Sequence, residues 1–148
     1  MHVEGSFDVR RDRDTVYAFF TDARLLMDCL EDPHTVEVAD EWHFTGTVTT
    51  GVAFIRGTFR MNGEYTVRQS PDHVTAKIHG GGLGSGLDGV ISTTLSEADG
   101  ITTVRWTADL TLSGPIATLG ERVVRSTIDK KTQSLFEHAR LTLEGRGS

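Results

Sequence analysis

The chain has 148 residues, of which 37% are hydrophobic and 24% are charged, the composition of a globular protein and not of a disordered one. Its formal net charge of -6, with lysines and arginines scattered, disfavours binding to nucleic acids and electrostatic docking on anionic lipid. This length suits one domain, and we expect a single domain over residues 1–148.

The cysteine content and the N-terminal residues bear on the cellular compartment. Cys29 is the sole cysteine and can form no disulfide within the chain, which fits a reducing environment. Residues 1–5 lack the basic start and the apolar stretch of a secretion signal. No window contains the roughly 18 consecutive apolar residues that a membrane-spanning helix needs. We therefore expect a cytoplasmic protein.

The first predicted elements are one strand and two short helices. Residues 3–9 alternate between apolar or small side chains and polar ones, the period-two pattern of a half-buried strand. Asp12 or Asp14 can cap a short helix that ends near residue 21. Residues 23–30 predict a second short helix, which ends before Pro33 because the residue before a proline avoids the helical region.

The middle of the chain is predicted to form strands. Val, Thr, Phe and Trp are abundant there, with Gly or Asp at the breaks. We expect six strands, at residues 35–42, 44–55, 57–68, 73–80, 85–96 and 101–112. The short connections between them favour an antiparallel meander. Glycines within the predicted strands suit a strongly curved sheet.

The last predicted element is a long helix from Pro115 to about Leu141. Proline suits the first helical position, where its missing N–H would be unpaired anyway. Apolar residues then recur at steps of three and four, at Ile116, Leu119, Val123, Val124 and Ile128. Residues 129–134 contain no apolar side chain. The middle of this helix is therefore expected to face something other than a plain core.

Motifs for catalysis or metal binding are missing from the sequence. The six histidines form no His-Glu-x-x-His pattern, and the glycine-rich residues 80–86 lack the Lys-Ser/Thr and the following helix of a phosphate loop. Cys29 has no cationic neighbour that would activate it, and no serine stands in a Gly-x-Ser-x-Gly elbow. We therefore predict no catalytic residue and no metal ligand.

Large apolar side chains on elements that should converge on one interior are the candidate lining of a ligand cavity. They are Phe19, Trp42, Phe44, Phe54, Phe59, Tyr65, Trp106, Leu110, Leu119, Val123 and Phe136. Ordinary core packing also explains such a set, because period-two patterning records burial and not empty space. The residues alone leave both interpretations open.

The order of elements and several short sequence segments resemble the CoxG branch of the START-like (SRPBCC) superfamily of polyketide cyclases and lipid transport proteins. This branch is named for the CoxG subunit of carbon monoxide dehydrogenase. The segments are Gly-Ser-Phe-Asp-Val at 5–9, Thr-Asp at 21–22 with Met-Asp-Cys-Leu at 27–30, the glycine-rich run at 80–89, Trp-Thr-Ala-Asp-Leu at 106–110 and Leu-Ser-Gly-Pro-Ile-Ala-Thr-Leu-Gly at 112–120. The resemblance runs from Val3 to about Leu141. It implies an α+β helix-grip fold, in which a curved seven-stranded antiparallel sheet wraps around the long C-terminal helix, with two short helices after the first strand.

The resemblance also implies a function. It suggests non-catalytic binding of a large hydrophobic molecule, a quinone or a lipid held without a covalent bond, in a cavity between sheet and C-terminal helix. The protein would then serve as an accessory or recruitment factor of a carbon monoxide dehydrogenase-type molybdenum hydroxylase. Two alternatives stay open. One is a cyclase or dehydratase with His79, Tyr65 or Asp109 as acid or base, and the other is a ligand-free scaffold for protein interaction.

Two departures from the family pattern affect these expectations. Cys29-Leu30 is followed by Glu31-Asp32 where relatives commonly have Pro-Gly, so this loop is expected to have another shape or partner. Many relatives carry a linker and an apolar tail after the last helix, which the sequence here does not show. Membrane contact is therefore expected to be peripheral and transient, at the inner face of the cytoplasmic membrane, through apolar residues at the cavity mouth.

Overall fold

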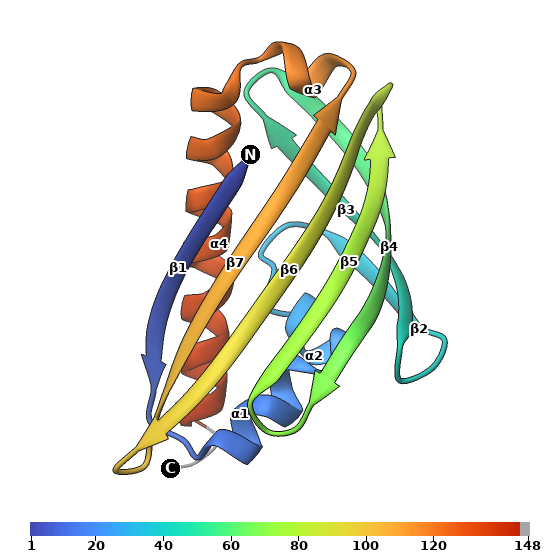
Figure 1. Ribbon diagram of the computed structural model, residues 1–148. Helices are drawn as coiled ribbons and strands as arrows, with labels where there is room; N and C mark the ends of the chain where they lie inside the picture. Colours follow the sequence, from blue (N-terminus) through green and yellow to red (C-terminus); the bar gives the residue numbers. More distant parts are fainter. Residues whose placement is uncertain (146–148) are drawn as a thin grey trace.

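A single antiparallel sheet organises the computed structural model, which describes residues 1–145 (Figure 1). Its seven strands lie in the order β1-β7-β6-β5-β4-β3-β2, so the meander from β2 to β7 is completed by β1, which pairs with β7. The strands are β1 (His2–Val9), β2 (His34–Val38), β3 (His43–Val52), β4 (Ile55–Gln69), β5 (His73–Gly82), β6 (Ser85–Ala98) and β7 (Ile101–Ser113). The predicted fold class is confirmed.

Two strand boundaries differ from the prediction in ways that matter. β2 ends at Val38 and not at residue 42, because the Asp40 carboxylate accepts hydrogen bonds from the backbone N–H groups of Trp42 and His43, at 2.7 and 2.8 Å, and so holds a turn. The β3–β4 hairpin turns at residues 53–54. The prediction placed this turn at residue 56, because the neighbouring Gly57 is a residue that turns favour. The predicted turn was therefore placed about three residues too late.

Four helices lie on one side of the sheet. α1 (Arg13–Phe20) and α2 (Ala23–Met27) begin at Asp12 and Asp22, whose carboxylates accept hydrogen bonds from backbone N–H groups of the first turn. The predicted C-terminal helix is divided into α3 (Pro115–Thr118) and α4 (Glu121–Gly145). The division falls at Gly120, whose φ of 91° ends the first segment. In Figure 1, α4 runs along the sheet while α1 and α2 close its lower end.

The main core lies at the end of the sheet that α1 and α2 close. Its buried residues come from β1, α1, β4 to β7 and the last turns of α4. Phe136 of α4 is central to this core, because its ring stacks on Phe7 with centroids 4.8 Å apart and lies 5.4 Å from Trp106. This aromatic cluster fixes the C-terminal half of α4 on the sheet.

Two glycines on the inner face allow aromatic rings to pack directly against the backbone. Trp106 lies over Gly5, directly across the β1–β7 ladder, and a Cβ at Gly5 would lie 2.9 Å from the indole nitrogen. Phe44 lies over Gly63 of the neighbouring strand, and a Cβ there would lie 2.1 Å from the ring. Neither space can hold both a ring and a methyl group, so these glycines are needed for close packing.

Replacing Phe136 by Ala should lower the free energy of unfolding by about 3 kcal/mol, since the ring packs on three other aromatic rings in the main core. The matched control is Val123→Ala on the same helix, where the side chain is 38% exposed and the expected loss is below about 0.5 kcal/mol. Urea unfolding measures both. Equal losses would show that the aromatic cluster does not hold α4.

Candidate functional site

A cavity of about 230 Å³ lies between the inner face of the sheet and the N-terminal half of α4. Most of its lining is apolar: Val48, Val52, Phe59, Met61, Leu87, Leu112, Ile116, Val124 and Ile128. Thr50, Thr127 and Ser85 add hydroxyl groups, and Lys131 is the only charged residue among the described residues of the lining. Gly80, Gly81 and Gly86 complete the lining, and a Cβ at any of them would clash with an atom of a neighbouring strand. The arrangement favours an uncharged, apolar occupant.

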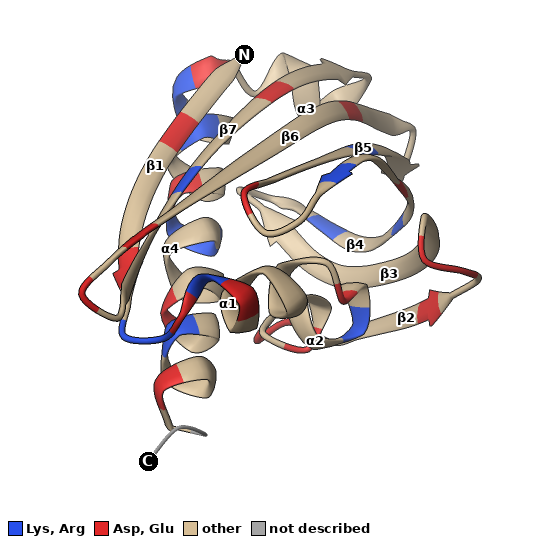
Figure 2. Ribbon diagram, turned by 60° about the horizontal axis from the view of Figure 1, so that its bottom comes forward, with Lys and Arg blue, Asp and Glu red and all other residues tan. Residues whose placement is uncertain are grey.

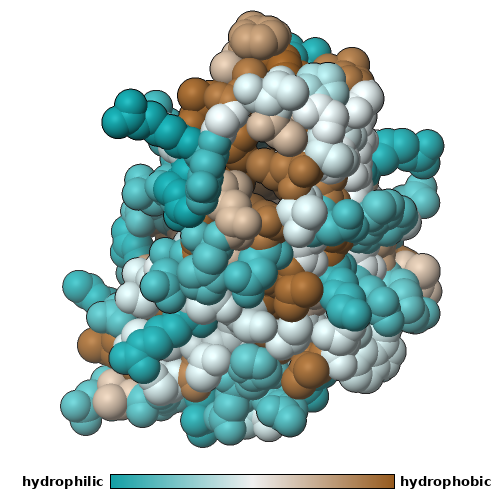
Figure 3. Space-filling model, turned by 45° about the horizontal axis from the view of Figure 1, so that its top comes forward, coloured by the Kyte–Doolittle hydropathy of each residue, from teal (hydrophilic) through white to brown (hydrophobic). Residues whose placement is uncertain are grey.

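The size of the cavity limits what it holds as it stands. It is larger than the ~150 Å³ of an apolar cavity that stays dry and binds benzene, and smaller than the ~300–1,000 Å³ of pockets for drug-sized ligands. Figure 3 shows hydrophobic atoms gathered around a hollow in the surface, in a view that brings forward the end of the sheet with the β3–β4 and β5–β6 hairpins. The observed cavity thus accepts one apolar segment, and a larger molecule needs the surrounding elements to move apart.

An ion pair closes one side of the cavity. Lys131 of α4 donates a hydrogen bond to Asp32 Oδ2 at 2.8 Å, and Thr50 of β3 donates to the same oxygen at 3.1 Å. The hydrogen bond from Lys131 holds the pKa of the Asp32 carboxyl below its usual value, against the opposing effect of partial burial. We refer to Asp32, Lys131 and Thr50 as the latch. It separates the cavity from a smaller hollow lined by Leu30 and Leu135, among others.

The loop that carries Asp32 is tied to α4 at a second point. His138 donates through Nδ1 to the Cys29 carbonyl oxygen at 3.1 Å, and its Nε2 lies 3.2 Å from Glu31 Oε1. These contacts explain the polar interruption in the helix sequence, because Lys131 faces the loop and not the sheet. The loop with Glu31-Asp32 therefore lies against α4 beside the cavity, behind the Lys131 and Thr50 side chains that line it.

The structure distributes the proposed cavity residues over four environments. Phe59 lines the cavity and Leu119 packs against the small apolar cluster next to it. Phe19 and Tyr65 are buried in the main core, Phe44 and Phe136 pack against that core, and Trp106 contacts Phe136. Leu110 lines two hollows near the N-terminus. Trp42, Phe54 and Val123 are exposed by 42, 83 and 38%.

The three exposed residues differ from the expectation of a shared interior for identifiable reasons. Trp42 lies in the turn after β2, where the Arg68 guanidinium sits 5.7 Å from its ring. Phe54 is at the tip of the β3–β4 hairpin and not inside a strand. Val123 follows the break at Gly120, which turns α4 so that Val124, and not Val123, faces the sheet.

Most of the observed lining was missed because the prediction concentrated on aromatic residues. Two aliphatic residues of the lining could have been predicted from the apolar patterns of the sequence. Leu112 continues the apolar alternation of the last strand, and Ile128 belongs to the apolar stripe of the helix. Met61 and Leu87 stand among glycines and polar residues, where alternation alone does not distinguish the two faces.

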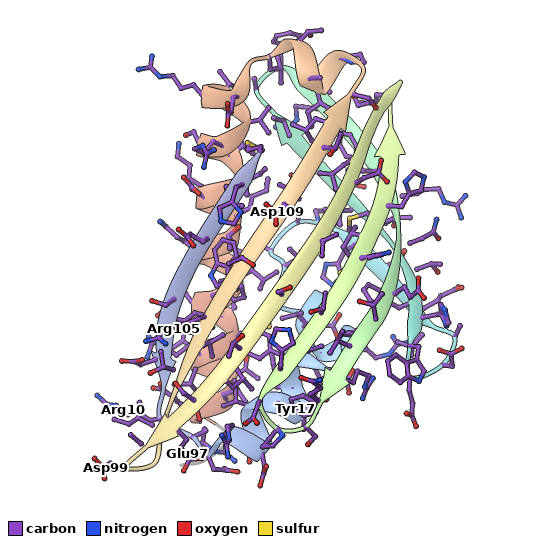
Figure 4. The ribbon with its side chains drawn as sticks, in the orientation of Figure 1. Arg10, Tyr17, Glu97, Asp99, Arg105 and Asp109 are labelled. Carbon is purple, nitrogen blue, oxygen red and sulfur yellow. The ribbon has the colours of Figure 1, made fainter. Side chains whose placement is uncertain are left out.

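The three candidate acids and bases do not meet in the cavity. Tyr65 is buried in the main core, where burial raises its pKa to about 12 and its hydroxyl donates to the Phe20 carbonyl oxygen at 3.1 Å. His79 and Asp109 lie on the outer face, paired with Asp88 and His2 respectively. Figure 4 labels Asp109 about midway along β7. The described residues of the cavity lining include one titratable side chain, Lys131, which is hydrogen-bonded to Asp32.

The helices and the polar side chains of residues 1–145 bear on membrane insertion and metal binding. Within this range, no helix is both long enough and apolar enough to cross a membrane. The same described residues contain no group of three or more His, Cys, Asp or Glu side chains placed to hold a metal ion.

Comparison with known proteins identifies relatives of the whole chain. The family model of CoxG, the carbon monoxide dehydrogenase subunit of that name, matches residues 5–143. A conserved protein from Geobacillus kaustophilus superposes with a TM-score of 0.89 at 18% identity, over 97% of this chain and 95% of that chain. A START superfamily protein from Mycobacterium smegmatis gives 0.78 at 8% identity, over 97% of each chain. No curated protein matches the sequence.

A third solved structure shows that this fold is not tied to one role. An HSP90 activator from Plasmodium falciparum superposes with a TM-score of 0.65 at 16% identity, over 97% of this chain and 96% of that chain. At such identities the solved structures establish the START-like fold alone. Arguments about function must come from the family match and from the cavity.

The latch predicts a specific dependence of stability on pH. Because the pKa of Asp32 is lowered in the folded protein, its contribution is present above the usual value of 3.8 and is lost as pH falls through the lowered pKa. Lys131→Met should lower the free energy of unfolding by less than about 1 kcal/mol at pH 7, and the difference from the parent protein should vanish in acid. Hydrogen exchange in residues 28–34 should become faster.

The matched control for this prediction is Lys130→Met, which removes the neighbouring, exposed lysine. It should change neither the acid dependence of stability nor the exchange rates of the loop. If the two variants behave alike, then the latch does not hold the loop against α4.

Proposed function

Because the chain belongs to the CoxG family of carbon monoxide dehydrogenase subunits, we propose that it binds one large hydrophobic molecule, a quinone or a lipid, between the sheet and α4. The molecule is held without a covalent bond and without a chemical reaction. The observation that carries this proposal is the apolar lining of the 230 Å³ cavity, in which Lys131 is the only charged residue among those described. Such a lining recognises a ligand by removing its apolar surface from water.

The energetics of this proposal are sufficient for useful affinity. Enclosing about 300 Å² of an isoprenoid chain yields roughly 7 kcal/mol at about 25 cal/mol per Å², before the cost of ordering the ligand. Since the observed cavity is smaller than pockets for drug-sized ligands, the bound state requires it to expand. The loop of residues 28–34 is the element that can move, because it is held to α4 by polar contacts at the latch and at His138.

The proposed partner is a carbon monoxide dehydrogenase-type molybdenum hydroxylase, in keeping with the name of the family. In this role the protein carries a quinone or a lipid at the inner face of the cytoplasmic membrane and acts as an accessory factor. The surface with the most distinctive chemistry near the cavity is the loop with Glu31 and Asp32, because two adjacent acidic side chains stand there. We propose this loop as the first surface to test for contact with the enzyme.

The test is mass spectrometry of an organic extract from the purified protein, compared with a variant whose cavity is filled. Thr127 lines the cavity from α4, so Thr127→Phe should place a ring in the empty space and abolish recovery of the bound molecule. Thermal stability should stay the same or rise, because filling a cavity is commonly stabilising. An unfolded variant is therefore not the expected cause of the loss.

The matched control is Ser126→Phe, which adds the same ring at the adjacent position on the solvent side of α4. This variant should retain the bound molecule at the level of the parent protein. Equal recovery from the parent and from Thr127→Phe would place the ligand outside the cavity and contradict the proposal.

A further inference from the structure

We propose that the end of the sheet at which the cavity is hollowed is a docking surface for a phospholipid bilayer. We refer to residues 50–58, 80–87 and 112–120 as the hairpin end, because they contain the β3–β4 hairpin, the β5–β6 hairpin and the corner between β7 and α3. This inference rests on the proposed function, since it says where the hydrophobic ligand enters. It assigns the contact to two named side chains.

The first observation is the exposure of two large apolar side chains at the hairpin tips. Phe54 is 83% exposed and Leu83 is 54% exposed, the two highest values among the large hydrophobic residues of the described chain. Leu83 is held in place because its side chain lies against Gly57 of the neighbouring hairpin. Exposed apolar groups of this kind are unfavourable in water, so a burying surface is expected.

The second observation is the backbone at these tips. Ala53 and Leu83 have φ of 55° and 56°, in the left-handed region that residues other than Gly, Asn and Asp rarely adopt. The β6–β7 hairpin at the opposite end has the same conformation at Asp99, with φ of 55°, and there the side chain is one that the turn prefers. The hairpin end thus retains apolar residues where the backbone favours polar ones.

The third observation is continuity with the cavity. The strands of the hairpin end supply Val52, Leu87 and Leu112 to the cavity lining, and the corner supplies Ile116. The corner is fixed to the β5–β6 hairpin, because the Ile116 N–H donates to Ser85 Oγ at 3.0 Å. Hydrophobic atoms surround the hollow in Figure 3. A molecule that leaves a bilayer beneath the tips would therefore meet the cavity directly.

The distribution of charge favours a bilayer as the occupant. The hairpin end contains one charged residue, Arg56, in a chain of net charge -6. The opposite end is crowded with charged residues, as Figure 2 shows, and Arg10, Glu97 and Asp99 lie there in Figure 4. Acidic groups lie only at the borders of the hairpin end, at Asp88 and Glu121, so of the two ends of the sheet it approaches an anionic lipid surface with less repulsion. A bilayer also accepts two protruding tips without the complementary shape and polar rim of a protein interface.

The binding should be weak and reversible. Stable attachment to a membrane requires a spanning helix or two strong signals together, whereas the hairpin end offers two apolar side chains and one arginine. Such a surface allows the protein to touch the bilayer, exchange a ligand and leave.

The experiment is flotation with vesicles of phosphatidylcholine that contain a minor fraction of phosphatidylglycerol. The variant carries Leu83→Asn and Phe54→Ser, and its partition onto vesicles should fall by about fivefold to tenfold. Its melting temperature should not fall, because Asn suits the left-handed backbone at position 83. If Leu83 instead stabilised the fold, its replacement would lower the melting temperature. The control is Leu141→Asn, which removes an equally exposed Leu, 53%, from α4.

Flotation of the double variant at the parent level would overturn the proposal. So would a loss of self-association by the same variant in sedimentation without vesicles, because the occupant would then be a second copy of the chain.

Binding of a water-soluble short-chain quinone, measured without vesicles, separates this proposal from the proposed function. Weakened flotation supports docking whether or not the quinone binds, whereas a failure of the parent protein to bind the quinone counts against the ligand assignment alone.

Discussion

The structure depends on how α4 is attached to the sheet. Phe136 stacks on Phe7 and contacts Trp106, and the main core extends from these rings to Ala139 and Leu143. These contacts bury the C-terminal half of the helix. The N-terminal half rests on a small cluster around Val124 and on polar contacts of Arg125 and Lys131, so the cavity forms beside that cluster and not beneath the aromatic rings. One helix thereby supplies both the stability of the fold and the space for a ligand.

The polar groups near the cavity hold the neighbouring loop against α4. Asp32 is occupied by Lys131 and Thr50, and His138 is occupied by the same loop. A partly exposed ion pair of this kind contributes little net stability, so it can open at small cost. A loop held by such contacts is well suited to move aside and enlarge the cavity for a ligand that is too large for it as it stands.

The sequence predicted the order and type of the elements because their signals are local. The alternation in β7, the capping Asp12 and the apolar stripe of α4 each lie within one element. The break at Gly120 was missed because apolar residues recur on both sides of it. The β3–β4 turn was misplaced because its tip, Ala53-Phe54, contains no residue that turns prefer, while Gly57 stands nearby. The family resemblance supplied the cavity, which periodicity cannot predict.

The same misplaced turn explains why the candidate site was predicted less well than the fold. Phe54 was assigned to a strand interior and became a cavity candidate, whereas it is the most exposed large hydrophobic side chain that the structure describes. The aromatic residues that were chosen mostly fill the main core, because bulky rings satisfy the packing around α1 and α4. The space left for a ligand is bordered by aliphatic side chains and glycines, whose patterns along the chain are weak.

The central claim is that an apolar molecule binds between α4 and the sheet. A crystal structure of the protein with a short-chain prenylated quinone tests this claim most directly. We expect the isoprenoid chain to lie among Phe59, Leu112 and Ile128, with the loop at Asp32 displaced from Lys131 and the main core unchanged. A quinone bound on the outer face of the sheet, or a cavity closed by its own side chains in the presence of saturating quinone, would contradict the account.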